Sequence, residues 1–198
     1  ATYPDPATRP AETYCWANHD WYGYPHPDDG QHMNCYAVVR ERLGITHEPY
    51  AKMKFAGFTF LVFPLIHDRR CEQMLDEACR ESPDRPVIVF DHSPPSDTVY
   101  GTSGWGSGGI RKLLEKYPNV IHISGHTHGS ARNEMQIWQG AFTAINDGGL
   151  AYYEFPVDGA TSQHPESSDN MAHILLVEVD AANRVKVRVC DLNAEAVL

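Results

Sequence analysis

Apolar residues along this chain fall into short runs and alternations that predict alternating strands and helices. Polar and apolar residues alternate around Ala56-Gly57, which predicts a β-hairpin over residues 50–63. Apolar residues three or four positions apart predict an amphipathic helix over residues 70–80. Uninterrupted apolar runs predict buried strands at residues 87–90 and 119–124, with a helix at residues 110–116 between them.

The remaining third of the chain is predicted to be mostly strand. We expect a strand pair over residues 135–145, a strand over residues 150–155 and a terminal hairpin over residues 172–189. Residues 158–170 are polar and without periodicity, which predicts an exposed loop, and the proline-rich residues 1–13 are predicted to be extended. Helices mixed with strands in 198 residues predict a single α/β domain that spans the chain.

Composition and charge limit the kinds of ligand and surroundings that the protein is expected to have. The formal net charge is -10 and the sixteen basic residues are scattered, which argues against a nucleic-acid backbone as ligand. No apolar run approaches the roughly 20 residues of a membrane helix, so we expect no membrane span and favour a cytoplasmic location. The five cysteines show no C-x-x-C spacing, which favours reduced thiols over a disulfide framework or zinc ribbon. The oligomeric state is left open.

Two histidines one residue apart follow the second apolar run. Residues 123–129 read Ile-Ser-Gly-His-Thr-His-Gly, and Gly125 allows the backbone to turn sharply where the strand ends. His126 and His128 can then project to the same side of the loop. Neutral imidazole is the commonest protein ligand for Zn, Fe, Mn and similar ions, so the pair is a candidate metal site. Loop histidines hydrogen-bonded to the backbone remain the alternative at this point.

Two further groups carry the same kind of side chain. His92 follows the apolar run at residues 87–90, and Pro94-Pro95 ends the strand and stiffens the turn behind it. Nearer the amino terminus, the consecutive residues Asn18-His19-Asp20 present an amide oxygen, an imidazole and a carboxylate. Donors of these types therefore occur at three separate places in the chain.

The order of these motifs resembles the later part of a calcineurin-like metallophosphoesterase, over roughly residues 14–154. The motifs that carry the resemblance are Asn18-His19-Asp20, His92 with Pro94, and Gly125-His126-Thr127-His128. The resemblance implies an α/β fold in which two mixed sheets are flanked by helices in a four-layer α/β/β/α sandwich. It also implies a dinuclear metal centre at the ends of the central strands, built from two divalent or mixed-valence ions such as Mn, Fe or Zn.

The resemblance assigns a role to each motif residue. It implies that one metal is bound by Asn18, His92 and His126 and the other by His128. It further implies that His19 is the general acid and that Asp20 orients it. Two metals clamp and polarise a phosphoryl group, and a histidine kept protonated by a carboxylate can protonate a poor leaving group. The expected activity is hydrolysis of a small phosphomonoester or phosphodiester.

One part of the family pattern is missing. Members begin with an Asp-x-His motif and a Gly-Asp-x-x-Asp motif, and neither precedes Asn18 here. The template therefore leaves one metal with His128 alone and removes the bridging carboxylate. We expect the chain to be the later two-thirds of a domain that lacks its first strands. The alternatives are a non-catalytic relative that binds a metal or a phosphorylated ligand, and a second chain that supplies the carboxylates.

Other conspicuous residues are given structural interpretations. The glycine-rich residues 101–109 lack the Gly-Lys-Ser/Thr ending of a nucleotide P-loop, so a mobile loop is favoured over a phosphate site. His122 lies inside an apolar run and is predicted to be a buried core histidine. His67 lies between two predicted elements, and a structural role is favoured for it. A mononuclear zinc hydrolase is disfavoured because Asn is a rare zinc ligand.

Overall fold

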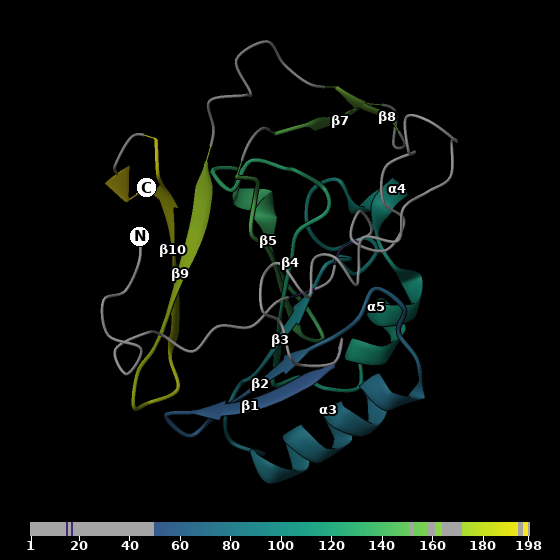
Figure 1. Ribbon diagram of the computed structural model, residues 1–198, viewed down its shortest axis with the longest axis vertical. Helices are drawn as coiled ribbons and strands as arrows, with labels where there is room; N and C mark the ends of the chain where they lie inside the picture. Colours follow the sequence, from purple (N-terminus) through teal and green to yellow (C-terminus); the bar gives the residue numbers. More distant parts are fainter. Residues whose placement is uncertain are drawn as a thin grey trace, which may run out of the picture.

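A six-stranded sheet is the centre of the protein. The computed structural model describes residues 15, 17, 50–150, 153–157, 161–163, 172–193 and 196–197. Its main sheet has the strand order β1-β2-β3-β4-β6-β5, where the strands are β1 (Ala51–Phe55), β2 (Phe58–Val62), β3 (Val87–Asp91), β4 (Val120–Ser124), β5 (Ile137–Gln139) and β6 (Thr143–Asn146). Strands β2, β3, β4 and β6 are parallel, and β1 and β5 are antiparallel edges (Figure 1).

The predicted hairpin and the two predicted central strands are confirmed. β1 and β2 pair in register from Ala51 with Val62 to Phe55 with Phe58. The turn residues Ala56 and Gly57 both have positive φ, at 49° and 81°, which is the backbone that a two-residue hairpin turn requires.

In the described part of the chain, three α-helices accompany the sheet: α3 (Arg69–Glu81), α4 (Thr102–Trp105) and α5 (Gly108–Leu114). α3 confirms the predicted amphipathic helix and buries Cys71, Leu75 and Ala78 against the sheet. It begins at Asp68, whose side chain accepts the backbone N–H of Arg70 at 2.8 Å and thereby satisfies one of the unpaired donors of the first turn.

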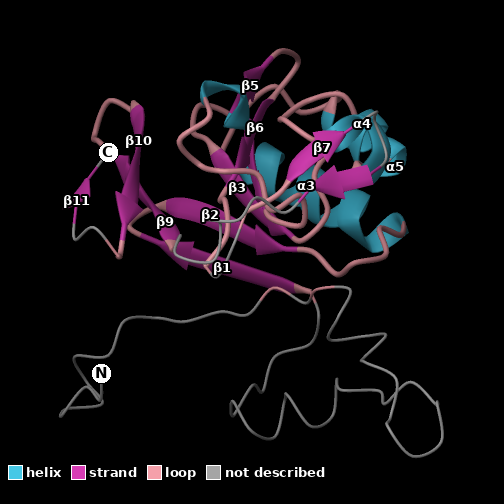
Figure 2. Cartoon of the chain, turned by 90° about the horizontal axis from the view of Figure 1, so that it is seen from above, coloured by secondary structure: helices cyan, strands magenta, loops and turns pink. Residues whose placement is uncertain are grey.

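The two faces of the sheet carry different apolar clusters. The helix-side core joins fully buried residues of the strands, α3 and α5, among them Leu61, Leu75 and Leu114. The opposite face presents Ile88, Ile121, Ile123 and Ile145, and a second sheet packs against it. Figure 2 shows the helices on one side of the main sheet and the second sheet on the other.

The second sheet has the order β11-β10-β9, with β9 (His173–Val179), β10 (Val185–Asp191) and β11 (Ala196–Val197). β9 and β10 form the predicted terminal hairpin, paired from His173 with Asp191 to Val179 with Val185. Helices, main sheet and second sheet make three layers, so the α/β fold class is confirmed. The fourth layer is not among the described residues and stays a prediction, as does a single domain over residues 1–198.

Several boundaries differ from the predictions. The strand expected over residues 150–155 begins only at Phe155, and part of the loop expected over residues 158–170 is strand. There β7 (Phe155–Val157) pairs with β8 (Thr161–Gln163) in a separate two-stranded sheet. Three-residue strands are too short for a period of two to be recognised. Residues 1–13 lie outside the described residues.

Helical turns also occur at two places where none was predicted, the glycine-rich stretch and the region of the predicted strand pair. α4 lies within residues 101–109, where a loop was expected, and Gly106 packs so tightly that an added Cβ would lie 2.5 Å from Ser96 Cα. A 3₁₀ turn, η2 (Glu134–Gln136), precedes β5 in the region predicted to be strand alone. Within the described part of the chain, no helix is long and apolar enough to cross a membrane.

Candidate metal centre

The loops that follow β3 and β4 bring the predicted histidines together. β3 and β4 are parallel neighbours, with Asp91 paired opposite Ser124 at their carboxyl ends. His92 comes directly after β3, and His126 follows β4 by two residues. Because carboxyl ends of parallel strands meet at one edge of a sheet, the two imidazoles converge there although they are far apart in sequence.

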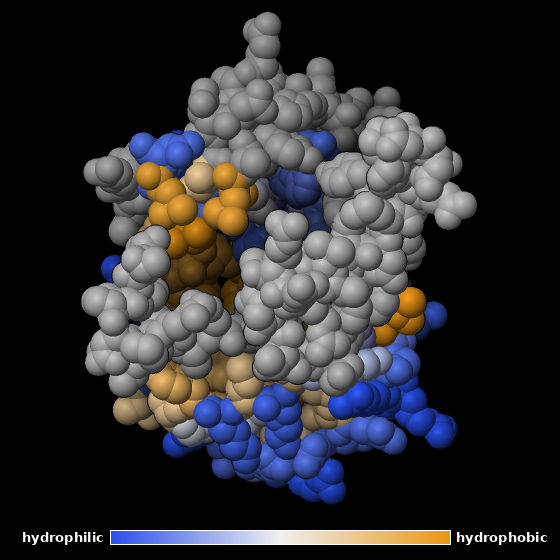
Figure 3. All heavy atoms as spheres, in the orientation of Figure 1, coloured by the Kyte–Doolittle hydropathy of each residue, from blue (hydrophilic) through white to orange (hydrophobic). Residues whose placement is uncertain are grey.

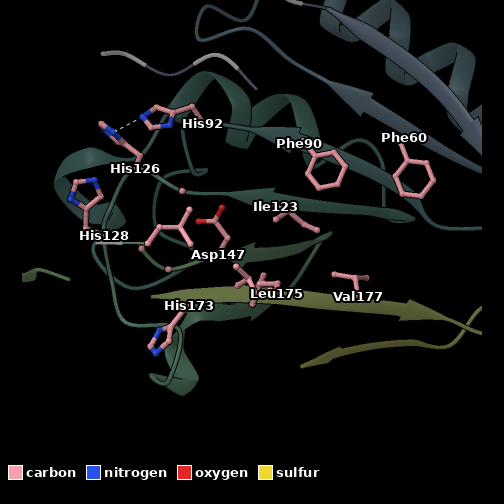
Figure 4. A pocket seen from close by; sticks show the side chains of 15 residues that line it. Phe60, Phe90, His92, Ile123, His126, His128, Asp147, His173, Leu175 and Val177 are labelled. Atoms are coloured by element: carbon pink, nitrogen blue, oxygen red, sulfur yellow. Dashed lines mark hydrogen bonds between the residues drawn. The ribbon is translucent and has the colours of Figure 1, made fainter. Parts of the chain in front are cut away.

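His92 and His126 lie within contact distance of one another. His92 Nε2 is 3.0 Å from His126 Nδ1, and the ring centroids are 4.8 Å apart at an interplanar angle of 65° (Figure 4). The Trp105 ring of α4 packs on the outer side, with its centroid 5.9 Å from that of His126. The two imidazoles therefore face each other through ring nitrogens, beside an aromatic wall that sequence reasoning did not predict.

The loop itself is built to turn both of its histidines. His126 and His128 have φ angles of 70° and 50°, a left-handed conformation that non-glycine residues adopt uncommonly and that carries strain. Between them Thr127 is buried, and its backbone N–H donates to the Gly125 carbonyl at 2.8 Å. His128 is held from the other side, since its carbonyl accepts the Glu154 N–H at 2.8 Å and its Nδ1 lies 4.0 Å from Glu154 Oε1.

All three histidines border one pocket of about 690 Å³ between the main sheet and β9. Its opposite wall is apolar, and Figure 4 shows the imidazoles and Asp147 at one end and the aromatic and aliphatic side chains at the other. The apolar lining residues are Phe60, Phe90, Ile123, Leu150, Ile174, Leu175 and Val177. Apolar atoms are visible deep in a hollow of the face seen in Figure 3. A volume of this size is typical of small-molecule sites.

Asp147 is a site residue that the sequence analysis missed. It follows β6, its N–H donates to the Ser124 carbonyl at 2.8 Å, and its carboxyl faces the pocket. Desolvation by the surrounding protein raises the pKa of Asp147 to about 7. Asn146 braces this corner by donating to the Gly125 carbonyl at 2.7 Å and accepting the Gly148 N–H at 3.0 Å. The sequence did carry a signal, because polar residues and two glycines follow an apolar strand here as well.

A second missed residue is Asp91, directly before His92. Its buried carboxylate accepts hydrogen bonds from His67 Nε2 at 2.6 Å and from His122 Nε2 at 3.3 Å. Desolvation raises the pKa of Asp91, but the hydrogen bonds from His122 and His67 outweigh it and hold that pKa below its usual range. His122 is fully buried, as predicted, and His67 also has a structural partner in this network.

The imidazole pair has donors and spacing that suit a metal ion. The 3.0 Å contact of His92 Nε2 with His126 Nδ1 is that of a hydrogen bond, and two nitrogens that share one tetrahedral ion at about 2.1 Å lie only slightly further apart, at about 3.4 Å. The described residues alone do not complete a site, since they contain no group of three or more His, Cys, Asp or Glu side chains placed to hold a metal. Asn18, His19 and Asp20 lie outside the described residues, so their predicted roles stay predictions.

The comparison with protein families agrees with the motifs. The family model described as calcineurin-like phosphoesterase matches residues 6–130, which contain the Asn18-His19-Asp20 motif and three of the histidines that line the pocket, His92, His126 and His128. The search of curated proteins found no match. The matched segment covers more than half of the 198 residues. The chain belongs to the calcineurin-like phosphoesterase family.

Proposed function

We propose that this protein hydrolyses a small phosphomonoester or phosphodiester at a dinuclear metal centre at the carboxyl ends of β3 and β4. The observation that carries the proposal is the 3.0 Å approach of His92 Nε2 to His126 Nδ1 on the wall of a pocket that His128 also lines. Family membership supports phosphoester chemistry. The ions themselves can be Mn, Fe or Zn, because imidazole, amide and carboxylate ligands suit all three.

Each residue has a distinct part in the proposed reaction. His92 and His126, together with Asn18, hold one metal, and His128 holds the other. Metal ions bound there would act as Lewis acids on the phosphoryl oxygens and supply hydroxide as nucleophile near neutral pH. His19 donates a proton to the departing alcohol, and Asp20 keeps the His19 imidazole protonated and oriented.

The pocket supports a small organic ester as substrate. No Lys or Arg is among the described residues that line it, so the metals would be the main source of positive charge for the phosphate on this part of the wall. The protein carries a formal net charge of -10, which adds to the case against a nucleic acid as substrate.

The alternative is a non-catalytic relative that binds a metal or a phosphorylated ligand. One observation favours it: Asp147 is the only carboxylate among the described residues that line the pocket, and the described residues contain no group of three or more His, Cys, Asp or Glu side chains placed to hold a metal. Such a protein would keep the fold and bind phosphate without turning an ester over.

Metal content and turnover, measured together, decide between the two. Metal per chain is determined by elemental analysis of protein purified without chelator, and hydrolysis is followed with p-nitrophenyl phosphate and bis-p-nitrophenyl phosphate. The hydrolase requires close to two metals per chain and metal-dependent turnover. One metal or none, with no turnover after metal is added, would support the binding protein instead.

Single substitutions test the role proposed for each residue. His126→Ala should lower both metal content and turnover, and His128→Ala should remove one of the two metals. His19→Ala should leave metal content intact and slow esters with poor leaving groups most. Tyr117→Phe is the control, since it removes only the hydrogen bond to Asp76 Oδ1 at 2.7 Å, outside the pocket. Loss of metal in His19→Ala would overturn the role of His19 as acid.

A further inference from the structure

One buried carboxylate beside His92 accepts three hydrogen bonds. The Asp91 side chain is 0% exposed, and its Oδ2 is the acceptor for both His67 Nε2 and His122 Nε2. Its Oδ1 accepts the backbone N–H of Ser93 at 3.1 Å. That last bond closes a short turn around His92, so the residues on both sides of this histidine are tied to the same carboxylate.

The donors come from three separate segments of the chain. His67 lies between β2 and α3, Ser93 lies in the turn after β3, and His122 lies on β4 opposite Val89 of β3. β4 leads directly into the loop that carries His126. The carboxylate of Asp91 therefore connects the segment that bears His92 with the strand that positions His126.

Stability alone does not account for a buried charge at this place. Burying a carboxylate is costly, and apolar residues of similar volume stabilise a core as well as a buried ion pair does. Apolar clusters already hold both faces of the sheet around it. What an apolar residue could not supply is a directional set of hydrogen bonds to two imidazoles and one backbone N–H.

We propose that Asp91 is a positioning residue that, with His67 and His122, sets the orientation of the His92 imidazole relative to that of His126. The proposal rests on the proposed function in so far as these two histidines bind metal. In this proposal Asp91 acts on the site by orienting His92, and it does not contact the substrate. Asp91, His67 and His122 are joined by hydrogen bonds. The described residues contain no group of three such side chains placed to hold a metal, so these three do not form a metal site themselves.

The first test uses the metal-free protein and nitrogen NMR of its histidine rings. Asp91→Asn keeps the size of the side chain but replaces one acceptor oxygen with a donor. We expect the ring resonances of His92 and His126 to shift and the coupling between the two rings to weaken. Tyr117→Phe should leave both resonances in place. Unchanged His92 and His126 resonances in folded Asp91→Asn would overturn the proposal.

The second test measures Co²⁺ binding to the full chain by competition with a chelator. Loss of a group that orients a metal ligand typically weakens binding by about 10–100-fold, so Asp91→Asn should show a loss of this size and an altered visible spectrum. Tyr117→Phe should change neither. Unaltered affinity and spectrum in Asp91→Asn would count against the proposal. If the unmodified protein binds no Co²⁺, the proposed function fails while the NMR test still decides the role of Asp91.

A milder variant guards against loss of folding. His67→Leu removes the donor of the 2.6 Å bond to Asp91 while leaving His122 and Ser93 as donors. We expect the same His92 resonance shift in the same direction but of smaller size. If His67→Leu is folded and its spectra match those of Tyr117→Phe, the network does not position His92.

Discussion

The two faces of the six-stranded sheet are packed differently. On the helix face the core side chains are closed off completely, and Leu61, Leu75 and Leu114 are all 0% exposed. On the other face Phe60, Phe90 and Leu175 remain half-buried and border the pocket. The same strands therefore contribute to a sealed core on one side and to an open, partly apolar wall on the other.

Because of this difference, the residues that contribute most to stability lie on one face of the sheet, and the candidate site lies at the other. The sealed face fixes the positions of β2, β3 and β4, and the described candidate metal residues follow β3 and β4, on the rim of the open face. A substitution in the closed core should mainly change the free energy of unfolding. A substitution on the open face should cost less stability, because less apolar surface is lost from the interior.

Matched leucine truncations test this contrast most strongly. Leu75→Ala on the helix face should lower the free energy of unfolding by about 2–5 kcal/mol, since it leaves a cavity in a sealed core. Leu175→Ala should lower it by roughly 1 kcal/mol, because half-buried side chains lose less on truncation. Urea unfolding of both variants provides the comparison. Equal losses would mean that the pocket wall is as fully packed as the helix face.

A smaller effect is expected at the start of α3. Asp68→Ala removes the acceptor for the Arg70 N–H and for the Tyr50 hydroxyl, which donates to Asp68 Oδ2 at 2.7 Å. We expect a loss of about 1 kcal/mol, the usual value of an N-cap. Asp68→Asn keeps an acceptor at the cap and should retain most of the stability in the same urea assay. If Asp68→Asn lowered the free energy of unfolding as much as Asp68→Ala does, the hydrogen bond at the N-cap would not be the source of the stabilisation.

The smallest effect is a pH dependence at the other end of α3. Hydrogen bonds from Lys54 and Lys52 lower the pKa of Glu81 from 4.5 to about 2. A carboxyl whose pKa is lower in the folded state stabilises the fold above its unfolded pKa and loses that contribution as pH falls. The loss should therefore occur between pH 4.5 and 2. The unfolding temperature of Glu81→Gln should fall less steeply than that of the unmodified protein as the pH is lowered. An identical fall in both proteins would exclude this contribution.

Local sequence patterns predicted the parts of the fold that depend on local chemistry. The hairpin at Ala56-Gly57, helix α3 and strands β3 and β4 were identifiable because turn residues, helical spacing and apolar runs act over a few positions. The short strands β7 and β8 were missed because three residues display no usable period. α4 was missed because glycine-rich sequence predicts a loop.

The candidate site was predictable only in part for a related reason. His92, His126 and His128 stand out because each follows an apolar strand, and the structure does bring them to one pocket. Asp91 was missed because its environment depends on the pairing of β3 with β4, which no local pattern encodes. Asp147 was missed although polar residues and two glycines follow an apolar strand there, because its place beside the histidines depends on the pairing of β4 with β6. The assignments of Asn18, His19 and Asp20 remain predictions from the family resemblance.

The convergence of His92 and His126 has a consequence for how the proposed metal centre would assemble. The two residues are 34 positions apart and meet only through the parallel pairing of β3 with β4, which has to form after the intervening helix-containing segment has folded back. In an unfolded chain only His126 and His128 are neighbours, and His92 joins them when β3 pairs with β4. Capture of metal would then act as a checkpoint of maturation, reached only by chains whose central sheet is already assembled.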